Sequence, residues 1–351
     1  MILNKISYQP VYQITRGEAI ESVHFGAIAI ANSQGELVAW YGEPTTLTFL
    51  RSSSKPLQAL PFIEKGGAER FGLSLQEIAL LCASHSGTDA HFKVARSIQQ
   101  KVGISEDNLL CGVHPSFHKP TANLMADRGE APSPNRHNCS GKHTGMLAYA
   151  KMEGYPIENY PDPEHPIQQN ILQTLSEMCS LEVDEIKLGI DGCSVPCFAM
   201  PMYNAALAWA RLADPNGLPP ERATACQTIT SAMTGYPNMV AGPGRFDTRL
   251  MEVAKGKIIA KGGAEAYQGL GIPAGALGRH SQALGIAVKL ADGDTRRRAK
   301  EAVVLEVLKQ LNALTDQELE DLQEFGPNKT MYNWRKLVVG QGGPCFTLNY
   351  K

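Results

Sequence analysis

The sequence lacks the excess of positive charge with which proteins bind nucleic acid or anionic lipid. Its 33 basic and 35 acidic side chains give a formal net charge of −2, whereas such proteins carry a basic patch or a strongly basic balance. The one dense basic run, residues 296–298 (RRR), stands at the start of a helical pattern and is expected to be a solvated face. We therefore expect neither a nucleic acid nor a membrane surface as partner.

Long apolar runs are also missing. No window of about 18 apolar residues occurs, so the sequence predicts no membrane span. The N-terminal segment MILNKISYQP has no positively charged stretch followed by an apolar one, and it does not match a secretory signal.

Cysteine is too scarce for a disulfide scaffold, with eight in 351 residues. Five stand in apolar or helical contexts, where reduced and buried thiols are expected: Cys82, Cys111, Cys179, Cys226 and Cys345. Cys139, Cys193 and Cys197 are instead flanked by Gly, Ser, Pro and Asn, which is typical of loops. This use of cysteine indicates a reducing, cytoplasmic compartment.

Strand signals gather near the two ends of the chain, and helical patterns fill the middle. The expected strands are residues 23–30, 36–41, 186–190, 257–261 and 284–290. The expected helices are residues 56–65, a segment opened by a capping box from Ser74 to Glu77, a segment capped by Asp89 that runs to Lys101, and residues 166–180, 201–213, 219–234 and about 295–314. Between them, residues 111–145 are expected to form a long functional loop.

This order predicts an α+β fold with one mostly antiparallel sheet flanked by helices, rather than alternating βαβ units. A chain of this length forms one large domain or two lobes. We expect one functional unit over residues 1–351, with a sheet lobe from about 1–50 and 250–351 and a mostly helical lobe from about 51–250.

Residues 51–56 (RSSSKP) contain one Ser-x-x-Lys spacing, from Ser52 to Lys55. On the first turn of a helix, residues three apart share a face, which brings this hydroxyl and amine within reach of each other. Serine needs an adjacent base to act as a nucleophile, and lysine is such a base only when burial or positive charge lowers its pKa. Arg51 would supply that charge or hold a substrate carboxylate. An ordinary helix cap followed by a surface lysine explains the same letters.

Two distant segments favour the chemical interpretation. CASHSGTDAH places Ser84, His85, Ser86 and His91 at a helix end, where a cap needs only one such side chain. In AKGGAE, Lys261 ends a strand before two glycines, which allow a ligand or another backbone to approach closely. Penicillin-recognising serine enzymes join Ser-x-x-Lys to Ser-x-Asn and Lys-Thr-Gly, and neither of these has a secure match here.

A third cluster combines HNCSGKHTG (137–145) with DGCSVPC (191–197). Cys139, Lys142 and His143 lie within one turn-sized segment, and Cys193 lies on another. The spacing is not that of a usual zinc site, because neither segment holds a Cys-x-x-Cys pair. Two thiolates with His143 or with a neutral lysine would bind zinc. Reduced pocket thiols, or Lys142 as a charge near the substrate, are the alternatives.

Six motifs occur in order along the chain: TRGEAIESVHFGAIAI, RSSSKPLQALP, CASHSGTDAH, NCSGKHTGMLA, IDGCSVP and KGGAEA. Together they resemble the bacterial L-asparaginase II family, the Rhizobium-etli-type or class 3 asparaginases, over about residues 10–350. The resemblance implies a fold like that of the serine β-lactamases and glutaminases, usually as a homodimer.

The resemblance also implies the residues of the site. It pairs Ser52 with Lys55 and Ser84 with Lys261 as two Ser-Lys tandems. It places the ligands of a zinc ion at Cys139, Lys142 and Cys193, with His143 and Asp191 lining the substrate pocket near the metal.

The implied reaction is the hydrolysis of L-asparagine to L-aspartate and ammonia. Ser52, deprotonated through Lys55, attacks the side-chain amide carbon and forms an acyl-enzyme, while Ser84 and Lys261 relay a proton to the ammonia. Whether Ser52 or Ser84 attacks first stays open, and the zinc is expected to orient the pocket or the substrate. Two rival functions remain: a penicillin-recognising serine acylase or peptidase on the same fold, and a non-catalytic zinc-binding protein.

Overall fold

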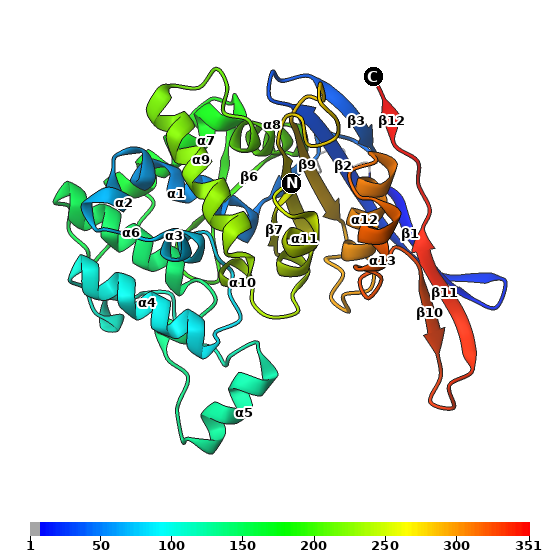
Figure 1. Ribbon diagram of the computed structural model, residues 1–351, viewed down its shortest axis with the longest axis horizontal. Helices are drawn as coiled ribbons and strands as arrows, with labels where there is room; N and C mark the ends of the chain where they lie inside the picture. The colour runs from blue at the N-terminus through cyan, green and yellow to red at the C-terminus, as the bar shows by residue number, and fades with distance from the viewer. Residues whose placement is uncertain (1–7) are drawn as a thin grey trace. The chain divides into compact units, whose positions relative to one another are not determined.

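Two compact units make up the chain, and the computed structural model describes residues 8–351 (Figure 1). The sheet unit comprises the chain up to residue 53, residues 200–214 and residues 253–351. The helical unit comprises residues 54–199 and 215–252. Residues 200–214 therefore belong with the sheet, although they lie in the stretch that the sequence assigned to a helical lobe. The expectation about a secretory signal concerns residues 1–10, most of which lie outside the described residues.

The sheet unit contains one nine-stranded sheet. Its main path is β10-β11-β1-β2-β9-β8-β7, and β3 pairs with both β2 and β12. The elements of the unit are β1 (Gln9–Arg16), β2 (Ala19–Asn32), β3 (Leu37–Tyr41), β4 (Leu47–Phe49), α8 (Met202–Ala213), β7 (Ile259–Gly263), β8 (Tyr267–Ile272), β9 (Leu284–Leu290), α12 (Lys300–Gln310), α13 (Asp316–Glu320), β10 (Lys329–Tyr332), β11 (Val338–Pro344) and β12 (Asn349–Tyr350). The paired neighbours in this sheet are antiparallel. The prediction of an α+β fold with a mostly antiparallel sheet is confirmed.

Helices cover both faces of this sheet. On one face α8 packs against β9, β8 and β2, so closely that a Cβ at Gly285 would overlap the carbonyl oxygen of Ala206. On the other face α12 contacts β8 and β9, and Lys300 donates a hydrogen bond to Gln268. Gln268 points away from α8 because side chains alternate along a strand. The strands between the two helices are therefore buried on both sides.

The helical unit is built around α1 (Lys55–Glu64), which contacts three other helices, α6, α7 and α9. Its elements are α1, α2 (Gly67–Arg70), α3 (Leu75–Leu81), α4 (Asp89–Val102), α5 (Lys119–Asp127), α6 (Ser140–Glu153), α7 (Pro166–Cys179), β5 (Lys187–Ile190), most of β6 (Pro196–Pro201), α9 (Pro220–Gly235), α10 (Pro237–Val240) and most of α11 (Phe246–Ala254). Short 3₁₀ turns also occur: η2 (Glu106–Asn108), η3 (Pro134–Arg136) and η4 (Val183–Glu185). The residues of α1 from Lys55 to Ile63 are all buried, which makes this helix the core of the unit.

Most of the predicted local structure is confirmed. The hairpin of β2 and β3, the helices α1, α7, α8 and α9, and the strands β5 and β9 lie where the sequence placed them. The capping box at the start of α3 is present, since the Ser74 hydroxyl accepts from the Glu77 amide and the Glu77 carboxylate accepts from the Ser74 amide. Residues 296–298 are exposed, as expected of a solvated basic run.

The predicted loop over residues 111–145 is wrong. This stretch contains α5, the turn η3 and the beginning of α6. Its glycines and asparagines resemble a loop in sequence, but Gly141 is needed for packing, because a Cβ there would overlap the carbonyl oxygen of Leu80 in α3. Lys142 and His143 therefore lie on the first turn of a buried helix rather than on a loop.

Three smaller predictions also need correction. Thr88, not Asp89, caps α4, through a capping box with His91. The last long helix is shorter than expected, because the Asp294 carboxylate accepts from the amides of residues 298, 299 and 300 and so fixes a turn before it. The strands β1, β8 and β10–β12 were not predicted.

None of the eight cysteines, all of which lie in the described part of the chain, forms a disulfide. Seven are buried, and Cys345 is partly exposed. Over residues 8–351 we find no helix with the length and apolar character that crossing a membrane requires.

Candidate active site

The helical unit brings a buried lysine against a serine and a cysteine that are far apart in sequence. The side chain of Lys55, at the first position of α1, is only 1% exposed. Its amine donates to the carbonyl oxygen of Ala83 at 2.6 Å, to Ser84 Oγ at 2.8 Å and to Cys139 Sγ at 3.1 Å. An ammonium group has three donors, so these three acceptors use all of them.

The segment that carries Ser84 follows the end of α3. The Ser84 amide donates to the Val240 carbonyl oxygen at 2.9 Å, and the His85 amide donates to the Asn138 carbonyl oxygen at 3.2 Å. The backbone on both sides of the serine is thus held, and its hydroxyl points toward the Lys55 amine.

A second lysine pairs with the second cysteine of the cluster. Lys142, on the first turn of α6, donates to Cys193 Sγ at 2.9 Å. Cys193 stands on a turn in which the Ser194 amide donates to the Asp191 carbonyl oxygen, and Ser194 has a positive φ of 76°. An Asp191 carboxylate oxygen lies 3.7 Å from the Cys193 sulfur.

The two cysteines share one hydrogen bond, which separates their acidities. The hydrogen bond from Cys193 holds the pKa of Cys139 well below its ordinary value against the effect of burial, helped by the positive charges of Lys55 and Lys142. The same hydrogen bond, together with burial, raises the pKa of Cys193. Cys139 is therefore the thiolate of the pair and Cys193 the thiol that donates to it.

Lys142 keeps its charge in this surrounding. Burial lowers its pKa, but the negative charges of Cys193, Cys139 and Asp191 outweigh burial, and the net effect is a raised pKa. The two ammonium groups and the thiolate thus form a charge-compensated cluster away from water.

His143 lies beside this cluster and is fully buried. Its Nδ1 is 2.6 Å from the Tyr160 hydroxyl, which accepts the Leu110 amide at 2.8 Å. The tyrosine therefore donates its proton to Nδ1, and the ring proton lies on Nε2. Burial, followed by the charge of Lys142, lowers the pKa of His143 well below its usual range. Its Nε2 has no hydrogen-bond partner among the protein groups of residues 8–351, so a donor is available next to Lys142.

The donors predicted for zinc fit that ion in number and type. Within the described residues there is no group of three His, Cys, Asp or Glu side chains that would hold a metal. A lysine amine is outside that set, and here two sulfurs and the Lys142 nitrogen lie within hydrogen-bond reach of one another. Catalytic zinc sites use three protein ligands of this nitrogen and sulfur class.

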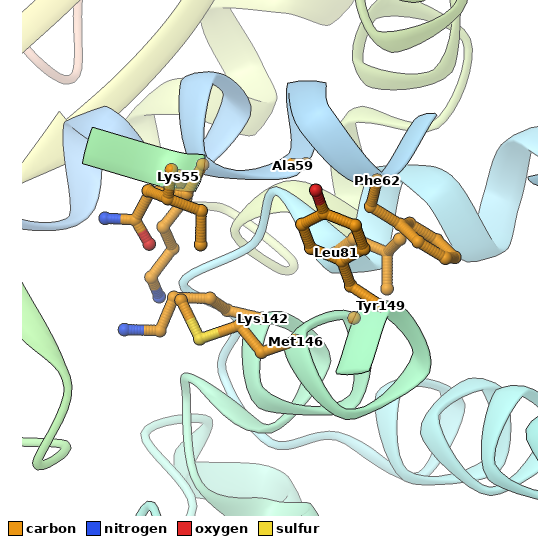
Figure 2. A pocket seen from close by; sticks show the side chains of 10 residues that line it. Lys55, Ala59, Phe62, Leu81, Lys142, Met146 and Tyr149 are labelled. Carbon is orange, nitrogen blue, oxygen red and sulfur yellow. The ribbon is translucent and has the colours of Figure 1, made fainter. Parts of the chain in front are cut away.

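A small cavity lies between Lys55 and Lys142 and the apolar core of the unit. Figure 2 shows the two lysines at one end and Phe62, Leu81 and Tyr149 at the other. Its volume is about 10 Å³, roughly the space of one water molecule. This cavity is too small to be the pocket of an amino-acid substrate.

Three of the predicted site residues belong to the sheet unit. Ser52 lies in the 3₁₀ turn η1 (Arg51–Ser54), which runs directly into α1, and Arg51 has a positive φ of 48°. Lys261 lies on β7, is 1% exposed and donates to the carbonyl oxygen of Gly262 at 2.6 Å. The pairings of Ser52 with Lys55 and of Ser84 with Lys261 therefore stay predictions of the sequence. Within the helical unit, the partners of Lys55 are Ala83, Ser84 and Cys139.

Sequence reasoning missed two contributors to the site. Tyr160, which fixes the ring of His143, stands in a segment of prolines and acidic residues that carries no signal. Ser140, which accepts from His85, lies inside a quoted motif but was not singled out. His85 itself was named as one of an unexplained cluster of polar side chains.

Comparison with known proteins gives one family. The sequence model of the family described as L-asparaginase II matches residues 12–343. No curated protein matches the chain.

Several solved structures share a distant likeness. A probable glutaminase from Bacillus subtilis, complexed with 6-diazo-5-oxo-L-norleucine, is 12% identical over 82% of this chain and 84% of its own, with a TM-score of 0.38. A Bacillus glutaminase in 4.3 M NaCl is 11% identical over 82% of this chain and 91% of its own, with a TM-score of 0.37. The protein Mglu in its native form is 13% identical over 84% of this chain and 67% of its own, with a TM-score of 0.41. At these values the likeness carries no argument about fold, substrate or mechanism.

Proposed function

This chain belongs to the L-asparaginase II family, and we propose that it hydrolyses the side-chain amide of L-asparagine to L-aspartate and ammonia. The family makes the chain an amidohydrolase. The choice of asparagine as the substrate and the route through a serine are the proposal.

The observation that carries the proposal is the hydrogen bond between the Lys55 amine and the Ser84 hydroxyl, 2.8 Å long. A serine hydroxyl becomes a nucleophile or a proton relay only beside a base. A surface lysine next to a helix cap would have no such partner, and Lys55 is buried. The contact therefore favours the chemical interpretation of the Ser-x-x-Lys spacing over a simple cap.

In the proposed reaction Lys55 is the base that two serines share. In its neutral form it takes the proton of Ser52 as that oxygen attacks the amide carbon of asparagine. The proton then passes through Ser84 to the nitrogen, ammonia leaves, and a β-aspartyl ester remains on Ser52. Water hydrolyses the ester by the reverse path, and Lys261 supports Ser84 as the resemblance implies. Exchange of the two serines, with Ser84 as the nucleophile, is the alternative within this proposal.

The charged ends of the substrate need opposite charges. Arg51 is proposed to bind the α-carboxylate, because a guanidinium binds carboxylates through two parallel hydrogen bonds. Asp191 is proposed to bind the α-amino group, and His143 is proposed to donate from its available Nε2 to the substrate.

Zinc is proposed to bind Cys139, Lys142 and Cys193. When bound there, it would supply positive charge that orients the polar groups of the pocket and of the substrate. Lys142 must lose its proton to bind the metal, so zinc binding releases protons. The homodimer and the cytoplasmic location stay proposals as well.

The test is ammonia release by the purified protein from L-asparagine and from L-glutamine, with and without added zinc. We expect turnover of asparagine, and a loss of turnover of at least roughly 10²-fold in Ser52→Ala and in Ser84→Ala. Nitrocefin hydrolysis without ammonia release would instead favour a penicillin-recognising acylase. Zinc binding without turnover of any of these substrates would favour a non-catalytic zinc-binding protein.

A further inference from the structure

His85 is a buried group that the proposed reaction does not use. It is fully buried and stacks on His91, with ring centroids 4.8 Å apart and an angle of 14° between the planes. Burial, followed by the charges of His91 and Lys55, lowers the pKa of His85 well below its ordinary value. The ring is therefore neutral and carries one proton.

The hydrogen bonds of the ring fix where this proton lies. His85 Nδ1 accepts from the Gly87 amide at 3.1 Å, so the proton is on Nε2. Nε2 lies 2.9 Å from Ser140 Oγ, and the Ser140 hydroxyl in turn donates to the carbonyl oxygen of Asn135 at 3.2 Å. Each donor and acceptor in this chain has one partner, so the direction of every bond is determined.

The two residues that this chain joins are neighbours of two partners of Lys55. Lys55 bridges Ser84 and Cys139 through its amine. One residue further on, His85 and Ser140 bridge the same two segments through their side chains. The segment after α3 and the start of α6 are thus tied together twice at one level.

We propose that His85 is a positioning residue, which holds Ser84 in hydrogen-bond distance of Lys55 by anchoring the Ser84–Thr88 segment to Ser140 on α6. The proposal rests on the proposed function, since Ser84 matters only if it takes part in the reaction. Without the bond to Ser140, the Ser84 segment keeps its backbone bonds to Val240 and Asn138 but loses its side-chain anchor to the helix that carries Cys139. A displacement of about 1 Å at a reacting group costs up to roughly 10²-fold in rate.

Two substitutions separate the functions of the two ring nitrogens. His85→Asn keeps an acceptor near the position of Nδ1 and removes the donor to Ser140. His85→Gln keeps a donor near the position of Nε2 and removes the acceptor of the Gly87 amide. Ser140→Ala removes the other end of the bond and only one oxygen atom, so this variant tests the proposal even if His85→Asn does not fold. His91→Gln is the matched control, because His91 is equally buried and stacks on His85 but does not contact Ser140.

The experiment measures kcat and KM for asparagine together with hydrogen exchange of the Ser84–Thr88 amides. We expect His85→Asn and Ser140→Ala each to lower kcat by roughly 10–100-fold with KM changed less than about twofold, which is the pattern of a lost transition-state alignment. The double variant should lose no more than either single one. His85→Gln should recover most of the rate, and His91→Gln should keep kcat within about twofold of the unsubstituted protein.

A kcat close to that of the unsubstituted protein in Ser140→Ala, additive losses in the double variant, or an equal loss of kcat in His91→Gln would overturn the proposal. If the unsubstituted protein releases no ammonia from asparagine, the proposed function fails, and the exchange measurement decides about the anchor. Faster exchange of the Ser84–Thr88 amides in His85→Asn and Ser140→Ala supports the anchor, and unchanged exchange contradicts it.

Discussion

Lys55 Nζ and Cys139 Sγ lie 3.1 Å apart in the buried centre of the helical unit. Because the same amine also donates to Ser84, the lysine joins a serine of the expected reaction to a cysteine of the expected metal site. The two sets of residues that the sequence singled out separately are therefore parts of one cluster.

Replacing Lys55 by methionine should abolish most of the activity while keeping the volume of the side chain. We expect ammonia release to fall by roughly 10²–10⁴-fold, the usual effect of removing a general base. Lys65→Met is the control, because Lys65 is half exposed and pairs with Glu153 at the surface. An activity of Lys55→Met within about threefold of that of Lys65→Met would show that Lys55 is not the base.

Zinc content should depend on the two clustered cysteines and not on the other buried ones. We expect the purified protein to bind about one zinc ion per chain, and Cys139→Ala and Cys193→Ala to lose it, because each removes one of three ligands. Cys226→Ala should keep the metal, since Cys226 is buried in α9 outside the cluster. Elemental analysis after dialysis measures this, and equal zinc in Cys193→Ala and Cys226→Ala would contradict the assignment.

His91 should make the fold sensitive to acid. Burial lowers its pKa from 6.5 to about 4, so the unfolded chain binds a proton there between about pH 6.5 and 4 that the folded chain does not. The stabilising contribution of the neutral ring is present above pH 6.5 and is lost as the pH falls toward 4, by about 3 kcal/mol in the limit.

The matched variant for this prediction is His91→Gln. Glutamine at this position can still accept from the Thr88 amide in the capping box, but it does not titrate. Urea unfolding at pH 7 and pH 4.5 should show a smaller loss of unfolding free energy for His91→Gln than for the unsubstituted protein. An equal loss in the two proteins would contradict the role of His91.

Gly141 should be required for the close contact of α3 and α6. A Cβ at Gly141 would overlap the Leu80 carbonyl oxygen, whereas one at Gly145, a turn later, would lie 3.2 Å from the flexible end of Leu81. We expect Gly141→Ala to cost about 1–3 kcal/mol through overpacking and Gly145→Ala to cost less. Denaturant unfolding of the two variants measures the difference, and equal costs would show that the helices can move apart freely.

The sequence predicts local structure well where the signal is itself local. The capping box at Ser74 and the hairpin turn after Asn32 depend on residues a few positions apart, and both are confirmed. The start of α6 was missed because glycine and asparagine are frequent in loops, while the need for Gly141 comes from Leu80, sixty residues away. The choice of Thr88 over Asp89 as the cap of α4 differs by one residue and depends on the His91 side chain.

The candidate site divides in the same way. The order of six motifs was enough to name the family and the residues at Cys139, Lys142 and Cys193, although no spacing among them is that of a usual zinc site. The contact of Lys55 with Cys139 spans 84 positions, and the link of His85 to Ser140 spans 55. Periodicity and spacing carry no information about pairs so distant, so these contacts required the folded chain.

The most direct measurement of the central claim is labelling with 5-diazo-4-oxo-L-norvaline, a reactive analogue of L-asparagine, followed by peptide mapping in a mass spectrometer. If a serine served by Lys55 attacks the amide carbon, one adduct per chain should form on Ser52 or Ser84, and Lys55→Met should abolish it. Turnover of asparagine with no adduct on either serine, or an adduct that forms equally in Lys55→Met, would contradict the account.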